Sequence, residues 1–156
     1  MNLLKYVTGL FAILMITVFP VAVRSDDICE ESLTRAEACV ASFVDGTVAS
    51  GAISDERLEK LICGLACEPD IYDVEITVGI RHIVPGGGSY YADINDSQVR
   101  SMLGRGETIL LSEGDTVTVR AEIVSPSVFS RLSGRYEGTL KRHAAGISMG
   151  RRMGRM

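Results

Sequence analysis

The sequence has few of the residues from which enzyme active sites are built. Its 156 residues include two histidines and no tryptophan, and 6% of them are aromatic. A hydrolase triad needs a base held beside a nucleophile, and no Gly-x-Ser-x-Gly or His-Glu-x-x-His motif is present. His82 falls on the apolar face of an expected strand, where we predict a hydrogen-bonded core side chain, and His143 follows two basic residues and is expected on the surface. The sequence therefore predicts a protein that is not an enzyme and that has no cofactor.

Cysteine spacings typical of metal and redox sites are also missing. The paired short spacings of zinc sites do not occur, and neither does a Cys-x-x-Cys motif. The four cysteines are even in number, lie in the first half of the chain, and predict disulfides in an oxidising compartment: Cys29, Cys39, Cys63 and Cys67. Cys39–Cys63 is the favoured bridge, because the two positions face each other in an expected helical hairpin. Cys67 lies one turn beyond Cys63 and is left to pair with Cys39 or Cys29.

Basic residues are scarce in the body of the chain and acidic ones are scarce at its end. From Asp26 to Glu75 there are 13 acidic and 3 basic residues, a net charge of −10. From Arg131 to Met156 there are 7 basic residues and 1 acidic residue, a net charge of +6. The acidic body argues against nucleic-acid binding. Residues 148–156 are predicted to form a basic, disordered tail.

One uncharged apolar run dominates the N-terminus. Residues 6–23 read YVTGLFAILMITVFPVAV and would form a helix about 27 Å long, close to the thickness of the bilayer's hydrocarbon core. We predict that residues 1–25 form a retained single-pass anchor in the cell membrane. Residues 6–23 then contact the lipid bilayer, and the body is extracytoplasmic. The alternative is a cleaved signal peptide and a secreted body.

Two helices are expected after the anchor. From Asp26 to Ser50 apolar residues recur at steps of three and four, which is typical of an amphipathic helix. Gly51 suits the end of this helix, and Ser54, followed by two acids, suits the start of a second one. Residues 26–68 are therefore predicted to form an extracytoplasmic helical hairpin that carries the four cysteines.

After Pro69 the apolar period changes from that of a helix to that of a strand. Alternation from Tyr72 to Val84 predicts a strand with one buried face, and the glycine-rich stretch from Pro85 predicts a flexible loop. A short helix capped by Asp96 or Ser97 is expected next, and a last strand near the C-terminus. Residues 70–147 are therefore predicted to form an antiparallel sheet domain. The expected fold is α+β, with a long N-terminal helix (transmembrane, then amphipathic), a helical hairpin and a small sheet.

Two acids around a glycine form the best candidate for a chemical site. Glu113, Gly114 and Asp115 lie between the apolar run at 109–111 and an alternating stretch at 116–124. A calcium site or an acid–base pair would need further oxygen ligands or a cleft. Gly114 is free to adopt a positive φ, and Asp115 can accept hydrogen bonds from neighbouring amides. We therefore predict a structural turn that joins two strands of a hairpin, with no metal and no catalytic residue.

Several segments together carry a family resemblance. They read ASFVDGTVASGAISDERLEKLI, IYDVEITV, SQVRSML, ILLSEGDTVTVRAEIVSP and KRHAAGIS, and LSEGDTVTV is the most distinctive part. In this order the chain resembles, over most of residues 1–150, the TadE-like, pilin-like membrane proteins associated with tight-adherence (Tad, or Flp) pilus systems of Gram-positive bacteria. The resemblance does not extend to a prepilin-processing site, because no acid follows Gly9 within the apolar run.

This resemblance implies a structural role. It implies an apolar N-terminal helix that packs against other pilin-like subunits or copies of the chain, and a sheet domain displayed outside the membrane. It implies no catalytic residue and no cofactor. We therefore expect a membrane-anchored pseudopilin-like component of a pilus or secretion assembly. The alternative, which the cysteines and the basic tail suggest, is a secreted, disulfide-stabilised binding module with a cleaved signal peptide.

Overall fold

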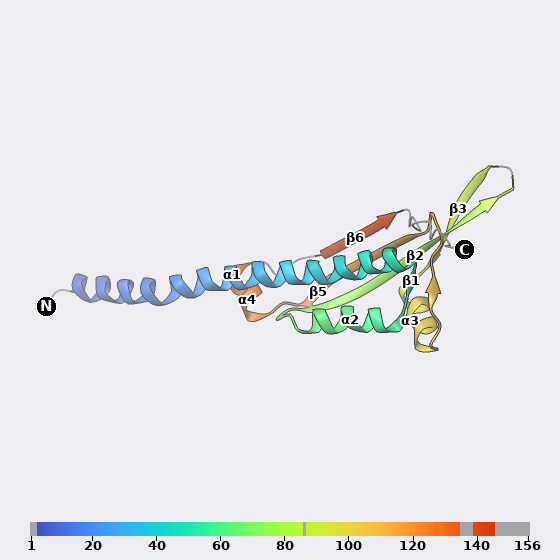
Figure 1. Cartoon of the computed structure of the whole chain (residues 1–156). Coiled ribbons are helices and arrows are strands. Elements are labelled where there is room, and N and C mark those ends of the chain that lie inside the picture. The colour runs from blue at the N-terminus through green and yellow to red at the C-terminus, as the bar shows by residue number, and fades with distance from the viewer. Residues whose placement is uncertain (1–2, 86, 135–138, 146–156) are drawn as a thin grey trace, which may run out of the picture.

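A single helix joins a projecting N-terminal segment to the body. The computed structural model describes residues 3–85, 87–134 and 139–145. Helix α1 spans Leu3–Ser50, 48 residues, with Pro20 inside it. Its first half extends away from the rest of the chain, and its second half packs along the body (Figure 1). The domain boundary expected after residue 25 therefore falls inside a continuous helix.

The second half of α1 has one buried face. Its buried residues recur at steps of three and four, as the sequence predicts for an amphipathic helix: Ser25, Cys29, Ser32, Ala36, Val40, Phe43, Val44 and Thr47. Those nearest the projecting half have small side chains. Larger side chains follow toward Ser50, and Val40, Phe43 and Val44 among them belong to the core cluster.

The helical hairpin forms as predicted. Gly51 has a φ of 65° and its N–H donates to the Thr47 carbonyl at 2.9 Å, which ends α1. Strand β1 (Ala52–Ile53) lies in the connection, and helix α2 (Asp55–Ala66) begins after the N-cap residue Ser54. The buried side chains of α2 are Leu58, Leu61 and Leu65.

The main sheet has four antiparallel strands in the order β3-β2-β5-β6. Strand β2 spans Ile71–Val84, β3 spans Gly88–Ile94, β5 spans Thr116–Ser125 and β6 spans Thr139–Ala145. Helices α1 and α2 lie on one face of this sheet (Figure 1). The protein therefore has the α+β fold that the sequence predicts.

Alternating side chains of β2 and β5 form the sheet's side of the core. The inward residues are Val74, Ile76, Val78, Val117, Val119 and Ala121. They pack with residues of α1 and α2 in one cluster, in which each large apolar side chain contributes about 1.5–3 kcal/mol on leaving water. On the opposite face Glu75 lies across from Arg120, and Thr77 across from Thr118. Such pairs suit a solvent-facing side of the sheet.

The prediction of a flexible loop after Pro85 is wrong, because residues 88–94 form β3 and pair with β2. The two strands form a hairpin that extends past the edge of the body (Figure 1). His82 is on this extension, so the prediction of a core histidine is also wrong. Its ring is exposed and stacks on Tyr90, with 5.1 Å between ring centroids. The alternation of burial holds as far as Val78, and from Arg81 onward the strand is exposed.

The predicted hairpin of 109–111 with 116–124 is wrong as well. Strand β4 (Ile109–Leu110) pairs with β1 in a separate two-stranded sheet, whereas β5 pairs with β2 and β6. The reason is a competing partner: the connection between α1 and α2 offers a free edge, and the Leu111 N–H donates to the Gly51 carbonyl at 2.9 Å.

Two short helices complete the body. Helix α3 (Asp96–Gly104) has Asn95 as its N-cap in place of the expected Asp96 or Ser97, and Asn95 and Gln98 form a reciprocal capping box. Helix α4 (Val128–Ser133) follows β5. Residue 143 lies in β6 and pairs with Thr118 of β5, but its side chain and the basic tail at 148–156 lie outside the described parts of the chain.

Candidate membrane anchor and the side chains that position it

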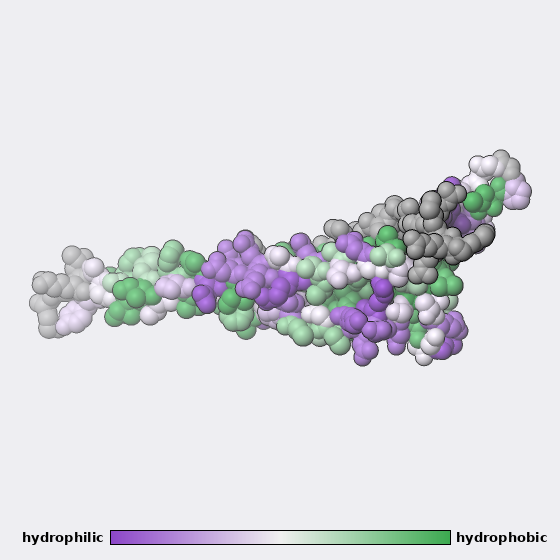
Figure 2. All heavy atoms as spheres, in the orientation of Figure 1, coloured by the Kyte–Doolittle hydropathy of each residue, from purple (hydrophilic) through white to green (hydrophobic). Residues whose placement is uncertain are grey.

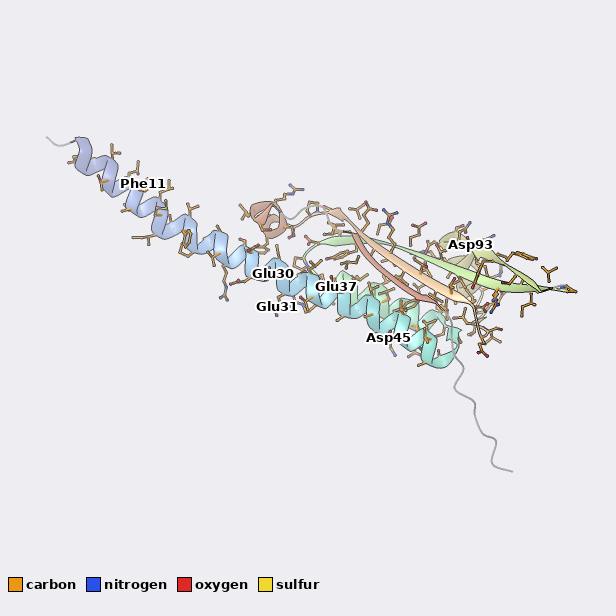
Figure 3. The ribbon with its side chains drawn as sticks, turned by 90° about the horizontal axis from the view of Figure 1, so that it is seen from above. Phe11, Glu30, Glu31, Glu37, Asp45 and Asp93 are labelled. Carbon is orange, nitrogen blue, oxygen red and sulfur yellow. The ribbon has the colours of Figure 1, made fainter. Side chains whose placement is uncertain are left out.

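The projecting half of α1 exposes apolar side chains all around the helix. Between Tyr6 and Val23, twelve large apolar side chains are 48% to 73% exposed. Figure 2 shows this part as mostly hydrophobic surface, and Figure 3 shows Phe11 on it, far from the sheet. By length and composition α1 can cross a membrane. A helix that is apolar on every side is typical of a membrane span or of a helix enclosed by other apolar helices.

Two hydroxyl groups, one in this stretch and one beside it, donate to carbonyls of the same helix. The Thr17 hydroxyl donates to the Ile13 carbonyl at 2.9 Å, and the Ser25 hydroxyl donates to the Val21 carbonyl at 2.8 Å. Such bonds lower the cost of placing a polar side chain in an apolar medium. Pro20 lies near the end of the run that faces the body, where the lost N–H disturbs little of the span.

A buried polar cluster joins α1, α4 and the residue before β2 where the projecting helix meets the body. The Asp70 carboxylate accepts hydrogen bonds from the Ser127 N–H at 2.6 Å and from the Ser130 hydroxyl at 2.7 Å. The Ser130 Oγ lies 3.5 Å from the Sγ of Cys29 on α1. A buried carboxylate is tolerated when its oxygens are hydrogen-bonded in this way. Asp70 and Ser130 are sixty positions apart, so no local sequence pattern indicated the cluster.

Next to this cluster, an ion pair joins α1 to the end of α2. The Nε of Arg35 lies 3.0 Å from the Oε1 of Glu68, whose side chain is almost fully buried. The hydrogen bond to Glu68 raises the pKa of Arg35 above its usual value. Burial raises the pKa of Tyr72 to about 12, and the negative charges of Asp70 and Glu68 add to the shift. These contacts fix α1 against the body.

Glu113, Gly114 and Asp115 form a tight turn, and the two acids point into different surroundings. Asp115 is 2% exposed and accepts hydrogen bonds from the Ser112 N–H at 2.6 Å and the Arg81 N–H at 2.8 Å. Gly114 has a φ of 95°, and Glu113 is exposed. The carboxylates therefore do not converge on one point, and Asp115 has its hydrogen bonds to backbone amides.

The predicted disulfides are not formed, and the cysteines are free thiols. The residue of α2 that faces Cys39 is Gly64: a Cβ added there would lie 2.9 Å from the Cys39 Sγ. Cys63 is exposed because Leu61 and Leu65, on either side of it, turn toward the core. The Cys39–Cys63 prediction thus missed the facing position by one residue. Cys67 is exposed and Cys29 is buried beside α4, so the alternatives fail too.

The outer surface of α1 is acidic. Glu30, Glu31, Glu37 and Asp45 lie along the part of α1 that packs on the body (Figure 3), and all four are exposed. Glu31 also pairs with Arg35 at 2.8 Å. Within the described ranges, no three histidine, cysteine or acidic side chains are grouped closely enough to bind a metal ion.

Comparison with protein-family models, with curated proteins and with solved structures finds no match to the chain.

Proposed function

We propose that the protein is a non-catalytic, pilin-like structural subunit anchored in the cell membrane by residues 6–23. In this proposal the body lies on the extracytoplasmic side, and copies of the chain or related subunits associate through α1. The observation that carries the proposal is the two-part character of α1. One continuous helix is apolar and exposed on every side in its first half and is packed on a sheet in its second half.

The exposed side chains of the first half favour a location away from water. Each large apolar side chain gains about 1.5–3 kcal/mol when it leaves water, and twelve of them lie between Tyr6 and Val23. Lipid and neighbouring apolar helices both supply such surroundings. The proposal therefore holds whether these side chains are surrounded by lipid alone or also by the helices of neighbouring subunits.

The contact between the body and the end of the apolar run favours a retained anchor over a cleaved signal peptide. A cut before Asp26 would remove Ser25, which is 1% exposed, and with it the residues that line a groove together with Phe129 of α4. The alternative, a secreted binding module, also depended on disulfides, and the cysteines are free. We therefore keep the anchored subunit as the proposed function.

A matched pair of charge substitutions tests the anchor. Ile16 and Ile83 are 73% and 75% exposed, but only Ile16 lies in the apolar run. An arginine in the middle of a membrane span costs about 2.5–3.5 kcal/mol, which is roughly a hundredfold in partitioning. Ile16→Arg is expected to reduce recovery in the membrane fraction strongly, whereas Ile83→Arg leaves it unchanged. Equal recovery of the two variants would contradict the anchor.

Cross-linking of the wild-type chain in its own membranes tests the assembly. A pilin-like subunit is expected to give a ladder of cross-linked multiples, and Ile16→Arg is expected to remove it. A chain that stays in the membrane but yields only the monomer would leave the anchor standing and rule out the assembly.

A further inference from the structure

A second apolar surface lies beside the end of the anchor, on helix α4. Val128 is 70% exposed, Phe129 41% and Leu132 58%, whereas Ser130 on the opposite side of this short helix is buried. Ile71 and Val124, at the adjoining ends of β2 and β5, are also exposed. The end of the body nearest the projecting helix thus carries apolar side chains on its surface.

The position of α4 relates this surface to the anchor. Phe129 lines a groove together with Pro20, Val21, Arg24 and Ser25, so α4 lies level with the end of the apolar run. Figure 1 shows α4 against α1 at the point where the helix leaves the body, and Figure 2 shows a small hydrophobic area there beside a hydrophilic stretch of α1. If residues 6–23 cross a bilayer, α4 is located at its boundary with water.

Buried hydrogen bonds fix the orientation of α4. Ser127 caps the helix by accepting from the Ser130 N–H at 3.2 Å, and Ser127 and Ser130 both donate to Asp70. The Ser133 hydroxyl lies 3.5 Å from the Cys29 Sγ on α1. With its polar side held against the body by these contacts, the helix keeps Val128, Phe129 and Leu132 on the outside.

We propose that α4 is a second membrane contact, a short interfacial helix that lies in the same bilayer surface from which α1 emerges. Val128, Phe129 and Leu132 enter the boundary between headgroups and acyl chains, at a depth of about 5–10 Å, as interfacial helices do. Arg24 and Arg131 are exposed beside them and lie at the level of the lipid phosphates. The proposal rests on the proposed anchoring function.

Lipid is the occupant that the location favours. Phe129 lines one groove with Pro20 and Val21 of the apolar run, so the surface of α4 adjoins the surface of the span. Apolar side chains next to arginines are also the composition found at membrane interfaces. In this arrangement the anchor and α4 together set the tilt of the body relative to the membrane.

The absence of tryptophan makes a direct test available, because one substitution introduces a unique fluorophore. The full chain carrying Phe129→Trp is reconstituted in vesicles of phosphatidylcholine and phosphatidylglycerol that contain brominated lipid. Bromine near the top of the acyl chains is expected to quench the emission more than bromine near the methyl ends. The emission is also expected to shift to the blue and to be protected from acrylamide.

Two further single-tryptophan chains separate this proposal from the anchor. Phe11→Trp reports on the span and is expected to be quenched by both brominated lipids. Ile83→Trp lies on the hairpin of β2 and β3 and is expected to be unquenched. If Phe11→Trp is quenched and Phe129→Trp behaves like Ile83→Trp, the interfacial helix is wrong and the anchor stands. If Phe11→Trp is unquenched, both proposals fail.

Leu132→Trp provides an independent position on the same face, since its side chain is exposed and tolerates a larger ring. It is expected to reproduce the quenching of Phe129→Trp. Protection from acrylamide without quenching by bromine, at both positions, would mean that a protein surface covers α4, and would overturn the proposal of a lipid contact.

Discussion

Asp115 accepts hydrogen bonds from two backbone amides that are far apart in the sequence. The Ser112 N–H belongs to its own turn, and the Arg81 N–H belongs to β2, thirty-four positions away. The Arg81 side chain also covers Gly114, where an added Cβ would lie 2.9 Å from the Arg81 Cδ. One buried carboxylate thus holds the turn against the sheet.

Replacing the two acids of this turn is expected to have unequal effects. Asp115→Ala leaves two amides without their charged acceptor and should lower the free energy of unfolding by about 2–3 kcal/mol. Glu113→Ala removes an exposed side chain and should change it by less than about 0.5 kcal/mol. Urea unfolding of the full chain in detergent, followed by tyrosine absorbance, measures both. Equal effects would contradict the structural role of Asp115.

Sequence reasoning could predict the local part of this arrangement and not the distant part. Gly114 lies between two acids, and this triplet lies between two apolar stretches. Such a pattern indicates a turn in which an acidic side chain accepts hydrogen bonds from nearby amides. The bond to Arg81 depends on how the turn meets β2, which no spacing encodes. The cluster of Asp70 and Ser130 was missed for the same reason.

At the scale of elements, the packing of α2 on α1 depends on the rotation of each helix about its axis. Periodicity predicted both helices and the turn at Gly51. It located the facing residues to within one position, which in a helix is a rotation of about 100°. Because of that error, the sequence prediction placed Cys63 opposite Cys39, whereas in the structure the residue opposite Cys39 is Gly64.

An engineered disulfide tests this rotation. A Cβ on residue 64 would lie 3.6 Å from the Cβ of Cys39, within the range of about 3.5–4.5 Å that disulfides require. Gly64→Cys, combined with Cys63→Ser and Cys67→Ser, is therefore expected to form a bridge to Cys39 on oxidation. The bridge should raise the free energy of unfolding by about 3 kcal/mol.

The control for this prediction is the Cys67→Ser chain, which also has three cysteines and keeps Cys63. Peptide mapping under oxidising conditions should find no bridge between Cys39 and Cys63 in that chain. A bridge there, with none to residue 64, would show that α2 is rotated differently.

For the strands, alternation in the sequence predicts which side chains are buried, but it does not predict which strands pair. The buried face of β5 was predicted from its alternating residues, because side-chain direction depends on the strand alone. The partner of β4 was not predicted. That partner, β1, lies more than fifty positions earlier and consists of two residues in the connection between α1 and α2. Strand β3 was hidden by the glycines before it, although its two tyrosines suit a strand.

At the scale of the whole molecule, α1 links the proposed location to the fold. The apolar run, its length and the change to an amphipathic pattern near Asp26 are all visible in the sequence. The continuity of the helix through this change, and the groove that α4 forms with its last apolar residues, come only from the structure. These two features favour an anchor that stays attached to the body.

The most direct test of this account is the intact mass and N-terminal sequence of the protein isolated from cells, measured separately for the membrane and soluble fractions. The account predicts that the protein is recovered in the membrane fraction with the apolar run at residues 6–23 still attached. A soluble protein whose mature terminus lies near Asp26 would contradict it.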